Sequence, residues 1–566
     1  MRVLGISTIV IIGLAAMAAA AAAGCGSNES TCEELGSCPP ATGQDASSEQ
    51  DGAAGAEGGQ DADGGIDGDA SKTDADTGPD ADGETGTDAE AEADAPEEPA
   101  CDTSKSPSEQ PCLIDDPYGV FVSPSGADSG SCGAKGAPCK TLGTAIGRAK
   151  AEGKRLYACG DGGTYAEQVT IDATLDGLKL YGGFKCSDWS YDAAAKAKVK
   201  PSAAGLALSV KGLTTGLLVE DFGFEAMDGA NAGDSSIAAI VEGSAGVVLR
   251  RVTVQAGAGV KGADGTPGVK GADGDAAGAE QNGKPASCTN PPAAQLGGSW
   301  DNSSACGSLG GLGGTAAKNG NGGSGNPGTP DTHVSPPGVD NKGDGSATIG
   351  ENASSGKAGS NADSGEVGTA ASSAGGFSVA GYSPAGGGSG VDGYPGQGGG
   401  GGGASKAAAT CIGASGGAGG MGGCGGTKGT GGGGGGASVA LIAWQSAVTL
   451  DGCTLLSAKG GDGGNGAPGG DGGIGKPGGT GGTALGTMGT GGPGGQGGNG
   501  GPGGSGAGGT GGPSYALVYK GDAPVQGTNT LTPGQGGTKG TGAQVPMFAK
   551  APDGSDGLSA GSHQQP

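Results

Sequence analysis

The chain has 566 residues, of which 140 are Gly, and only 33% of its residues are hydrophobic and 3% aromatic. This composition excludes a single globular core that spans the whole chain, because ordinary domains carry far more apolar side chains. The net charge of −28 argues against a nucleic-acid-binding protein, since phosphate backbones require a basic surface.

Residues 1–24 carry the features of a secretory signal peptide. Arg2 precedes a long apolar run that ends in small residues, which is typical of a cleaved signal rather than of a permanent membrane span. The stretch "AAGC" at 22–25 resembles a bacterial lipobox, although Ala22 stands where that motif usually has Leu. The resemblance implies that Cys25 becomes the lipidated first residue, and that the protein is anchored to the outer membrane or cell surface of a bacterium. The alternative is ordinary cleavage after an Ala-x-Ala site, followed by secretion.

Most of the 14 cysteines lie in close pairs, which in an exported chain indicate disulfides that staple loops. Zinc is disfavoured because the chain lacks a Cys-x-x-Cys motif and has only two histidines, His333 and His563. If Cys25 carries a lipid, six pairs remain and Cys453 is left as a buried free thiol. Seven disulfides without a lipid are the alternative. The predicted pairs are Cys32 with Cys38, Cys101 with Cys112, Cys132 with Cys139, Cys159 with Cys186, Cys288 with Cys306, and Cys411 with Cys424.

The short N-terminal segment 25–38 leads into a linker at 39–100 that has almost no apolar residues. Residues 41–100 hold 12 Asp and 7 Glu against one Lys. This composition predicts a disordered chain that is extended by its own charge. Behind a lipid-bearing cysteine such a linker would act as a stalk. The alternative is a solubilising linker without a spacing role.

The composition becomes that of a folded domain near residue 113, and we assign 101–258 to the first part of this domain. Residues 141–153 have apolar residues at helical spacing, and the stretches "KRLYAC" and "EQVTI" that follow have strand character. Residues 118–190 resemble the entry unit of bacterial right-handed parallel β-helix proteins of the pectate-lyase-like superfamily, apart from the loop that Cys132 and Cys139 bracket. The resemblance is carried by Val122-Ser123, Gly126, Asp128, Pro138, Thr141-Leu142, Ala145-Ile146, Ala149, Gly160, Gly163-Thr164-Tyr165, Glu167 and "LYGGF" (180–184).

Four segments share one pattern: 206–227, 237–258, 439–458 and 515–534. Each begins with an apolar strand whose second residue is Ala, passes through a polar loop into a triplet, turns at two bend residues and closes with a second triplet. Stacked copies of such a unit can share a core that no single copy could bury. We therefore predict an all-β fold, a right-handed parallel β-helix or β-solenoid. A β-sandwich or jelly roll is the alternative, which explains the strands but not the repeat.

Long glycine-rich insertions at 259–437 and 459–513 separate the later repeats, which leaves single coils at 438–458 and 514–535. Insertions in a repeat fold map to one face, so both tracts are predicted to leave from the same corner. The remaining residues, 536–566, are predicted to form a glycine-rich disordered tail.

The glycine tracts allow four interpretations. Residues 259–274 have Gly at every third position, which is the collagen period, but the strict run is short, has one Pro and breaks after Gly274. Calcium-binding glycine repeats require Asp in a frame that Asp462 and Asp471 do not reproduce. The other two interpretations are flexible low-complexity loops and packed polyproline-II-like strands, which lie close together because glycine has no side chain. In composition the tracts also resemble bacterial PE-PGRS-type surface proteins.

The resemblance to pectate-lyase-like enzymes makes Arg250 and Arg251 candidates for a catalytic base, with Glu220 and Asp221 beside them. All four fall at the two-residue bend of a repeat, where a solvated corner is the simpler interpretation. We therefore predict no catalytic residue, and retain the two arginines only as ligand contacts.

A row of threonines at Thr253, Thr454 and Thr530 occupies the middle of the last triplet in three repeats. Middle positions point outward if the flanking apolar residues point inward, so this row could contact a carbohydrate. The high β-propensity of Thr is the simpler explanation.

Together these patterns predict a non-enzymatic, exported, membrane-tethered surface protein that serves envelope structure or carbohydrate or surface interaction. A polysaccharide lyase or hydrolase is the alternative. The expected partners are the membrane, through the N-terminal lipid, and polysaccharide or envelope components, and no nucleic acid. No metal or cofactor is expected, with calcium as the alternative.

Overall fold

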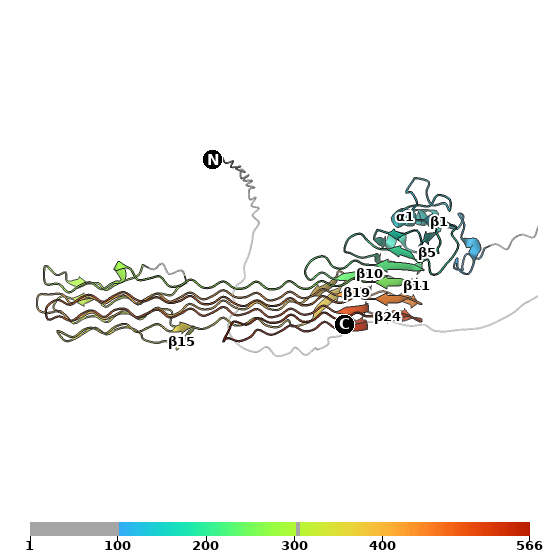
Figure 1. Cartoon of the computed structure of the whole chain (residues 1–566). Coiled ribbons are helices and arrows are strands. Elements are labelled where there is room, and N and C mark those ends of the chain that lie inside the picture. The colour runs from blue at the N-terminus through green and yellow to red at the C-terminus, as the bar shows by residue number, and fades with distance from the viewer. Residues whose placement is uncertain (1–100, 302–305) are drawn as a thin grey trace, which may run out of the picture. The chain divides into compact units, whose positions relative to one another are not determined.

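Three parallel β-sheets lie at one end of the described structure, and long glycine-rich chains extend from them (Figure 1). The computed structural model describes residues 101–301 and 306–566. Helix is scarce among these residues, where the one α-helix is α1 (Leu142–Glu152). None of the described helices combines the length and the apolar character that a bilayer crossing requires.

Several features predicted for the N-terminal hundred residues lie outside the described part of the chain. They are the signal peptide, the lipidation site Cys25 and the acidic linker. Cys32 and Cys38 also lie outside it. The disulfide between these two cysteines therefore stays a prediction, unlike the pairs further along the chain.

The strands of each sheet lie side by side in the following order. Sheet 1 consists of β1 (Gly119–Val122), β2 (Arg155–Cys159), β5 (Lys179–Phe184), β8 (Leu217–Glu220), β11 (Val247–Arg250), β20 (Val448–Asp451) and β23 (Val525–Gln526). Sheet 2 consists of β4 (Val169–Ile171), β7 (Leu208–Lys211), β10 (Ser236–Glu242), β19 (Ser438–Trp444), β22 (Ser514–Lys520) and β25 (Ser559–Gln564). Sheet 3 consists of β3 (Thr164–Tyr165), β6 (Ala197–Val199), β9 (Phe222–Glu225), β12 (Thr253–Gln255), β21 (Thr454–Leu456) and β24 (Thr530–Thr532).

Each predicted repeat gives one strand to each sheet. The first repeat supplies β7, β8 and β9 to sheets 2, 1 and 3, and the other three repeats visit the sheets in the same order. The bend residues of successive repeats pair with each other, since Arg250 lies opposite Glu220 on one side and Asp451 on the other. The chain is thus predominantly β with parallel sheets, an arrangement compatible with the predicted β-helix.

The largest apolar core draws its side chains from all three sheets. In β11, Val247 and Leu249 are buried, whereas Val248 and Arg250 between and after them are partly exposed. This alternation follows from the two-residue period of a strand, which places every second side chain inside. The repeats stack because each needs its neighbours to cover this apolar face.

The helix α1 covers the core beside β1, β2 and β4. It begins after Thr141, whose hydroxyl accepts a hydrogen bond from the amide of Thr144, and it ends at Gly153 with a left-handed φ of 64°. Both ends match the usual chemistry of helix caps. The side chains at the predicted helical spacing are buried: Leu142, Ala145, Ile146 and Ala149.

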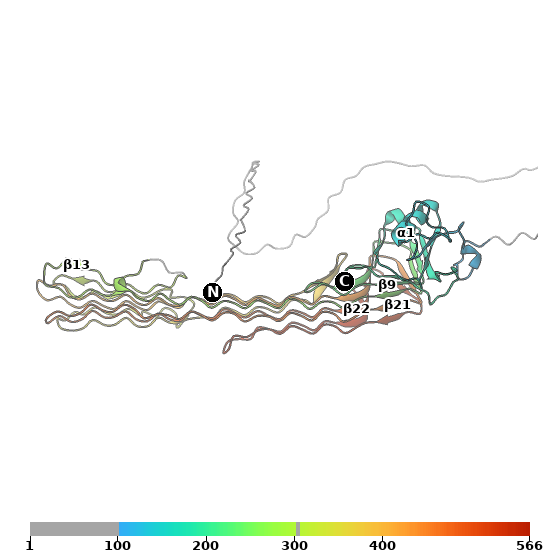
Figure 2. The same cartoon turned by 45° about the horizontal axis from the view of Figure 1, so that its top comes forward.

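The glycine-rich tracts are packed, hydrogen-bonded chains. They leave after β12, β21 and β24 and return to β19, β22 and β25, so all depart from sheet 3, as predicted for one corner. Figure 1 and Figure 2 show them running side by side. Gly262 donates to the carbonyl of Asp462 at 2.8 Å, and three residues further on Gly265 donates to Asn465 at 2.8 Å. This three-residue repeat is that of a polyproline II helix, so packed polyproline-II-like strands are the interpretation that the hydrogen bonds support.

The run Gly398–Gly403 shows why glycine accumulates in the centre of this bundle. A Cβ atom on Gly401 would lie 1.9 Å from the carbonyl oxygen of Leu312, so no larger residue fits there. Gly399–Gly401 contact six different segments: their amides donate to Gly420, Lys357 and Asn326, and their carbonyls accept from Gly311, Gly495 and Gly343.

Short antiparallel pairs lie at the margins of the longest tract: β13 (Ala294–Gln295) with β14 (Ala316–Ala317), β15 (Val334–Ser335) with β16 (Asn361–Ala362), and β17 (Gly375–Ser378) with β18 (Gly381–Pro384).

Residues 536–566 take part in this packing, which differs from the disordered tail that the sequence predicts. Gly537 donates to the carbonyl of Gly512 at 2.9 Å, and Gly540 donates to Gly509 at 2.9 Å. The chain then returns and β25 pairs with β22. The tail is held because its glycines recur at the spacing that lets one polyproline-II-like strand approach the next.

The disulfides agree with the predicted pairs outside the glycine tracts and differ within them. Cys101–Cys112, Cys132–Cys139 and Cys159–Cys186 are present. The predicted pairings of Cys288 with Cys306 and of Cys411 with Cys424 are wrong, because Cys288 bonds Cys411 and Cys306 bonds Cys424. The chain runs out and back in adjacent strands, which brings together cysteines that are 123 and 118 residues apart in the sequence. Cysteines that are close in the sequence, in contrast, are separated in space when the strand between them is extended.

Cys453 is a buried free thiol, as predicted. Its Sγ donates to the carbonyl of Leu249 at 3.1 Å. Burial raises the pKa of this thiol, which keeps it protonated and unreactive.

Candidate functional site

The bend residues that follow β8, β11 and β20 lie one above another and share an unusual backbone conformation. Asp221, Arg251 and Gly452 have φ values of 57°, 53° and 63°, in the left-handed region that favours glycine. The third repeat has Gly452 at this position, the residue that a left-handed φ favours. The first and second repeats instead have the charged residues Asp221 and Arg251 there. Their side chains are held by ion pairs.

Four charged side chains form a cluster at this bend, which we call the bend cluster: Glu220, Asp221, Arg250 and Arg251. Arg250 contacts the Glu220 carboxylate at 2.7 Å, and Arg251 contacts Glu220 at 3.0 Å and Asp221 at 2.8 Å. Glu220 is only 1% exposed. The solvated corner predicted from the sequence is thus wrong for the two carboxylates, because the arginines of the next repeat cover them.

Residues far away in the sequence complete the bend cluster. Ser106 Oγ donates to Glu220 at 3.0 Å, and Tyr191 Oη donates to Asp221 at 2.8 Å. The ammonium group of Lys196 donates to the carbonyl of Arg251, and burial lowers the pKa of this lysine. Sequence reasoning missed these partners, because nothing in the local sequence marks them as neighbours of the bend.

The chemistry open to the bend cluster is restricted by these contacts. Hydrogen bonds that Arg251 donates to the Asp221 carboxylate raise the pKa of Arg251 further above its ordinary value. A general base must give up its proton near neutral pH, which a guanidinium paired with buried carboxylates does not do. The arrangement is that of an ion-pair network joining successive repeats.

The threonine row lies where the sequence predicts it. Thr253 lies opposite Gly223 on one side and Thr454 on the other, and Thr454 lies opposite Thr530. Thr253 and Thr454 are partly exposed and Thr530 is exposed, so the row faces out of sheet 3. This face is regular, but none of its contacts points to a ligand.

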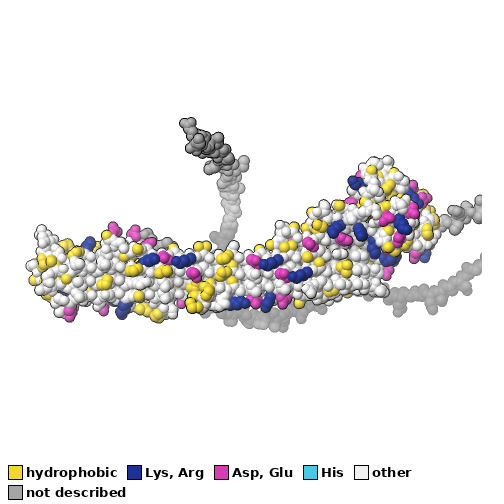
Figure 3. Space-filling model, viewed as in Figure 1, with side chains coloured by type: hydrophobic (Ala, Val, Ile, Leu, Met, Phe, Trp, Pro, Cys, Tyr) yellow, Lys and Arg dark blue, Asp and Glu magenta, His cyan; other side chains and the backbone are white. Residues whose placement is uncertain are grey.

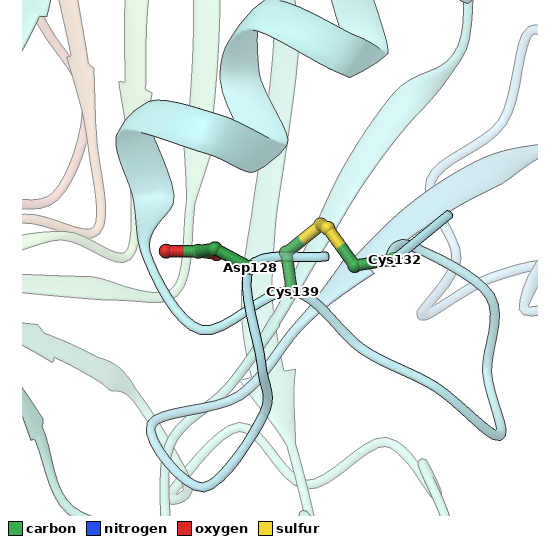
Figure 4. Close-up of side chains that lie close together, drawn as sticks. All are labelled: Asp128, Cys132 and Cys139. Carbon is green, nitrogen blue, oxygen red and sulfur yellow. A yellow bond between two sulfur atoms is a disulfide. The ribbon is translucent and has the colours of Figure 1, made fainter. Parts of the chain in front are cut away.

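Asp128, Cys132 and Cys139 come close enough together to resemble a metal site (Figure 4). Cys132 and Cys139 are bonded to each other, so neither offers the thiolate that a metal needs. The Asp128 carboxylate accepts hydrogen bonds from the amides of Lys140 and Thr141, at 2.8 Å and 3.0 Å. These contacts hold the loop before α1 in place. With both cysteines in a disulfide and the carboxylate bonded to backbone amides, the three residues do not offer the ligands of a cation site.

Both histidines stack on tyrosines. His333 lies parallel to Tyr394 with ring centroids 4.0 Å apart, and His563 lies parallel to Tyr515 at 4.6 Å. Tyr515 belongs to β22 and His563 to the neighbouring strand β25, so this stack joins the last two strands of sheet 2.

Searches of protein families, curated proteins and solved structures give no match to this chain. What defines this class of protein is therefore its own geometry, in which parallel sheets carry a bundle of disulfide-linked glycine strands.

Proposed function

We propose that this protein is a non-enzymatic, exported surface protein in which a right-handed parallel β-helix carries a stiff projection of glycine strands. The observation that carries the proposal is the glycine bundle, in which backbone hydrogen bonds and two disulfides join segments from 257 to 558. Such a bundle presents mostly backbone and uncharged side chains, as Figure 3 shows for one face. It suits a role in spacing, display or envelope structure.

The constant order in which the repeats visit the three sheets supports the β-helix. Its handedness and its likeness to pectate-lyase-like proteins remain part of the proposal. The five disulfides among the described residues favour an oxidising compartment, which agrees with export. The membrane anchor at Cys25 and a carbohydrate or envelope partner complete the proposed role.

A lyase or hydrolase activity is the alternative that the sequence leaves open, and it gains no support from the bend cluster. Arg250 and Arg251 are both engaged by carboxylates. A turnover assay on uronate-rich polysaccharides, with and without calcium, tests this alternative, and measurable turnover would contradict the non-enzymatic role.

Anchoring is tested by cell fractionation of the wild type and of Cys25→Ala. We expect the wild type in the membrane fraction and the variant in the soluble fraction. Equal membrane association of both proteins would overturn the lipid anchor. Binding to a glycan array tests the interaction role separately.

A further inference from the structure

A pocket of about 260 Å³ lies at the N-terminal end of sheet 1, where α1 leads into β2. Three of its lining residues are cationic, namely Lys154, Arg155 and Lys179, and none is acidic. This is unusual for a protein whose net charge is −28. We call it the cationic pocket.

Arg155 is the least expected member of this set, because it is only 8% exposed. Its guanidinium donates to the carbonyls of Lys105 and Thr103 and lies 5.5 Å from the ring centroid of Tyr181. No carboxylate in the described part of the chain forms an ion pair with it. A buried cation that has only neutral partners favours an anion nearby, since burial strengthens their attraction.

The other donors of the cationic pocket are available to a ligand. Lys179 is exposed and its ammonium group has no partner among residues 101–301 and 306–566. Lys154 has one partner, Glu152, at 3.0 Å. Thr103 and Tyr118 also line the pocket, and their hydroxyl groups have no hydrogen-bond partner within the same described ranges.

The cationic pocket continues into a shallow groove of about 170 Å³ that shares Gly177 and Lys179 with it. The floor of the groove contains Leu218 and Val248, which follow Lys179 across the outer face of sheet 1. The nearby Asp176 carboxylate turns toward the backbone amides of residues 214–216, with the closest at 2.8 Å. Positive charge therefore lies at one end of the groove and an apolar floor lies at the other.

We propose that this groove binds an acidic oligosaccharide, with a carboxylate or sulfate group in the cationic pocket and the next sugar ring on Leu218 and Val248. Lys179 and Lys154 bind the anionic group, Arg155 supplies positive potential behind it, and the hydroxyls of Thr103 and Tyr118 bind the sugar. An anionic lipid shares the charge pattern, but the floor is short and hydroxyl groups line the charged end, which favours a sugar. This inference rests on the carbohydrate-binding part of the proposed function and names its site.

The test measures binding of the full-length protein to two probes of equal length, tetragalacturonate and the neutral cellotetraose, by isothermal titration calorimetry. We expect tetragalacturonate alone to bind. Lys179→Ala should weaken that binding about tenfold or more, because a charge-assisted hydrogen bond is lost, and adding Lys154→Ala should weaken it further. Lys211→Ala is the matched control, since Lys211 is an exposed lysine of sheet 2 that pairs with Glu242 at 3.2 Å. It should bind like the wild type.

The possible results distinguish the proposed sugar site in the cationic pocket from the more general carbohydrate-binding role of the protein. Equal binding of both probes, or tetragalacturonate binding that Lys179→Ala leaves intact, would overturn the cationic pocket while the carbohydrate role stands. Failure of both probes, together with silence on a glycan array, would overturn both. Inorganic sulfate binding as tightly as tetragalacturonate would reduce the site to an adventitious ion only. Lys179-dependent binding of phosphatidylglycerol vesicles but not of tetragalacturonate would replace the sugar by a lipid.

Discussion

Gly401 lies inside the bundle, with its amide donating to Asn326 and its carbonyl accepting from Gly343. Only glycine fits at such a position, because each strand lies so close to its neighbours that there is no room for a Cβ atom. The opposite case is Glu220, a charged side chain that is buried because its partners surround it. At both positions the neighbours in space determine which residue is tolerated.

Gly401→Ala should lower the free energy of unfolding by about 1–3 kcal/mol or more, as overpacking does in a close-packed core. The added Cβ would lie 1.9 Å from the oxygen of Leu312, and backbone must move to relieve the contact. Gly136→Ala is the control, since nothing lies within 4 Å of a Cβ atom there. It should be neutral or stabilise by up to about 1 kcal/mol. Urea unfolding followed by circular dichroism measures both, and equal effects would contradict tight packing of the bundle.

Glu220→Gln should destabilise the protein by about 1–3 kcal/mol, because it weakens charged hydrogen bonds to Arg250 and Arg251 while preserving shape. The arginines are 38% and 35% exposed, so solvent screening keeps the loss below that of a fully buried pair. The control is Glu242→Gln, whose partner Lys211 is 67% exposed and whose loss should cost about 0–1 kcal/mol. If the two substitutions cost the same in thermal unfolding, the bend cluster is not a stabilising network.

At the scale of the element, the number of glycines in each triplet follows the number of buried faces of a strand. The strand at 259–274 lies at the margin and has one glycine per triplet. The strand at 491–501 has the pattern Gly-Gly-x and exposes Pro493, Gln496 and Asn499. The fully enclosed Gly398–Gly403 has glycine throughout. The three-residue period of the strands also brings Lys and Asp three residues apart into contact, as in Lys261–Asp264 at 2.7 Å.

Acidic residues at the exposed positions join neighbouring strands, which predicts a dependence of stability on pH. Asp273 accepts hydrogen bonds from the Ile474 amide, Lys270 and Lys476, and these hold its pKa below the ordinary range. A hydrogen bond from Lys550 likewise lowers the pKa of Asp553 to about 2. Since folding favours the ionised form, this stability is present above about pH 4, the pKa of unfolded Asp, and is lost as the pH falls toward 2.

Melting temperatures between pH 7 and pH 2 should therefore fall below about pH 4, where unfolded Asp titrates. Asp273→Asn should lower the melting temperature at pH 7 and have a smaller effect at pH 2, because most of the stability that the lowered pKa supplies is lost once unfolded Asp is protonated. Asp471→Asn is the control, because the Asp471 side chain has no hydrogen bond within the described ranges. An Asp273→Asn effect of the same size at both pH values would show that its charge is not involved.

The strands and the repeats could be predicted from the sequence, because alternation of apolar residues directly reflects which face is buried. The partners of Cys288 and Cys306 could not, since they depend on which strands run side by side after a long excursion. Ser106 and Tyr191 were missed at the bend cluster for the same reason. Lys154 and Arg155 are adjacent in the sequence, but only the fold brings Lys179 beside them.

At the scale of the whole molecule, residues 101–301 and 306–566 combine two ways of filling an interior. The three sheets bury alternating apolar side chains, whereas the glycine tracts bury backbone and satisfy it with hydrogen bonds between strands. The second way needs no aromatic or aliphatic core, which explains how a chain that is 33% hydrophobic packs so much of its length. The disulfides Cys288–Cys411 and Cys306–Cys424 then tie the outgoing and returning parts of the longest tract.

Limited proteolysis of the native protein tests this packing in one experiment. A protease must pull several residues into its active site, so segments whose amides are bonded to neighbouring strands should resist cleavage. We expect proteinase K to leave the tracts 387–403, 417–436 and 460–512 intact in the native protein and to cut them once it is unfolded in urea. Reduction of the disulfides in the native protein should expose new sites near Cys288 and Cys306, while the sheets stay protected. Rapid cleavage of the three tracts in the oxidised native protein would mean that they are loose loops, and the proposed stiff projection would have to be abandoned.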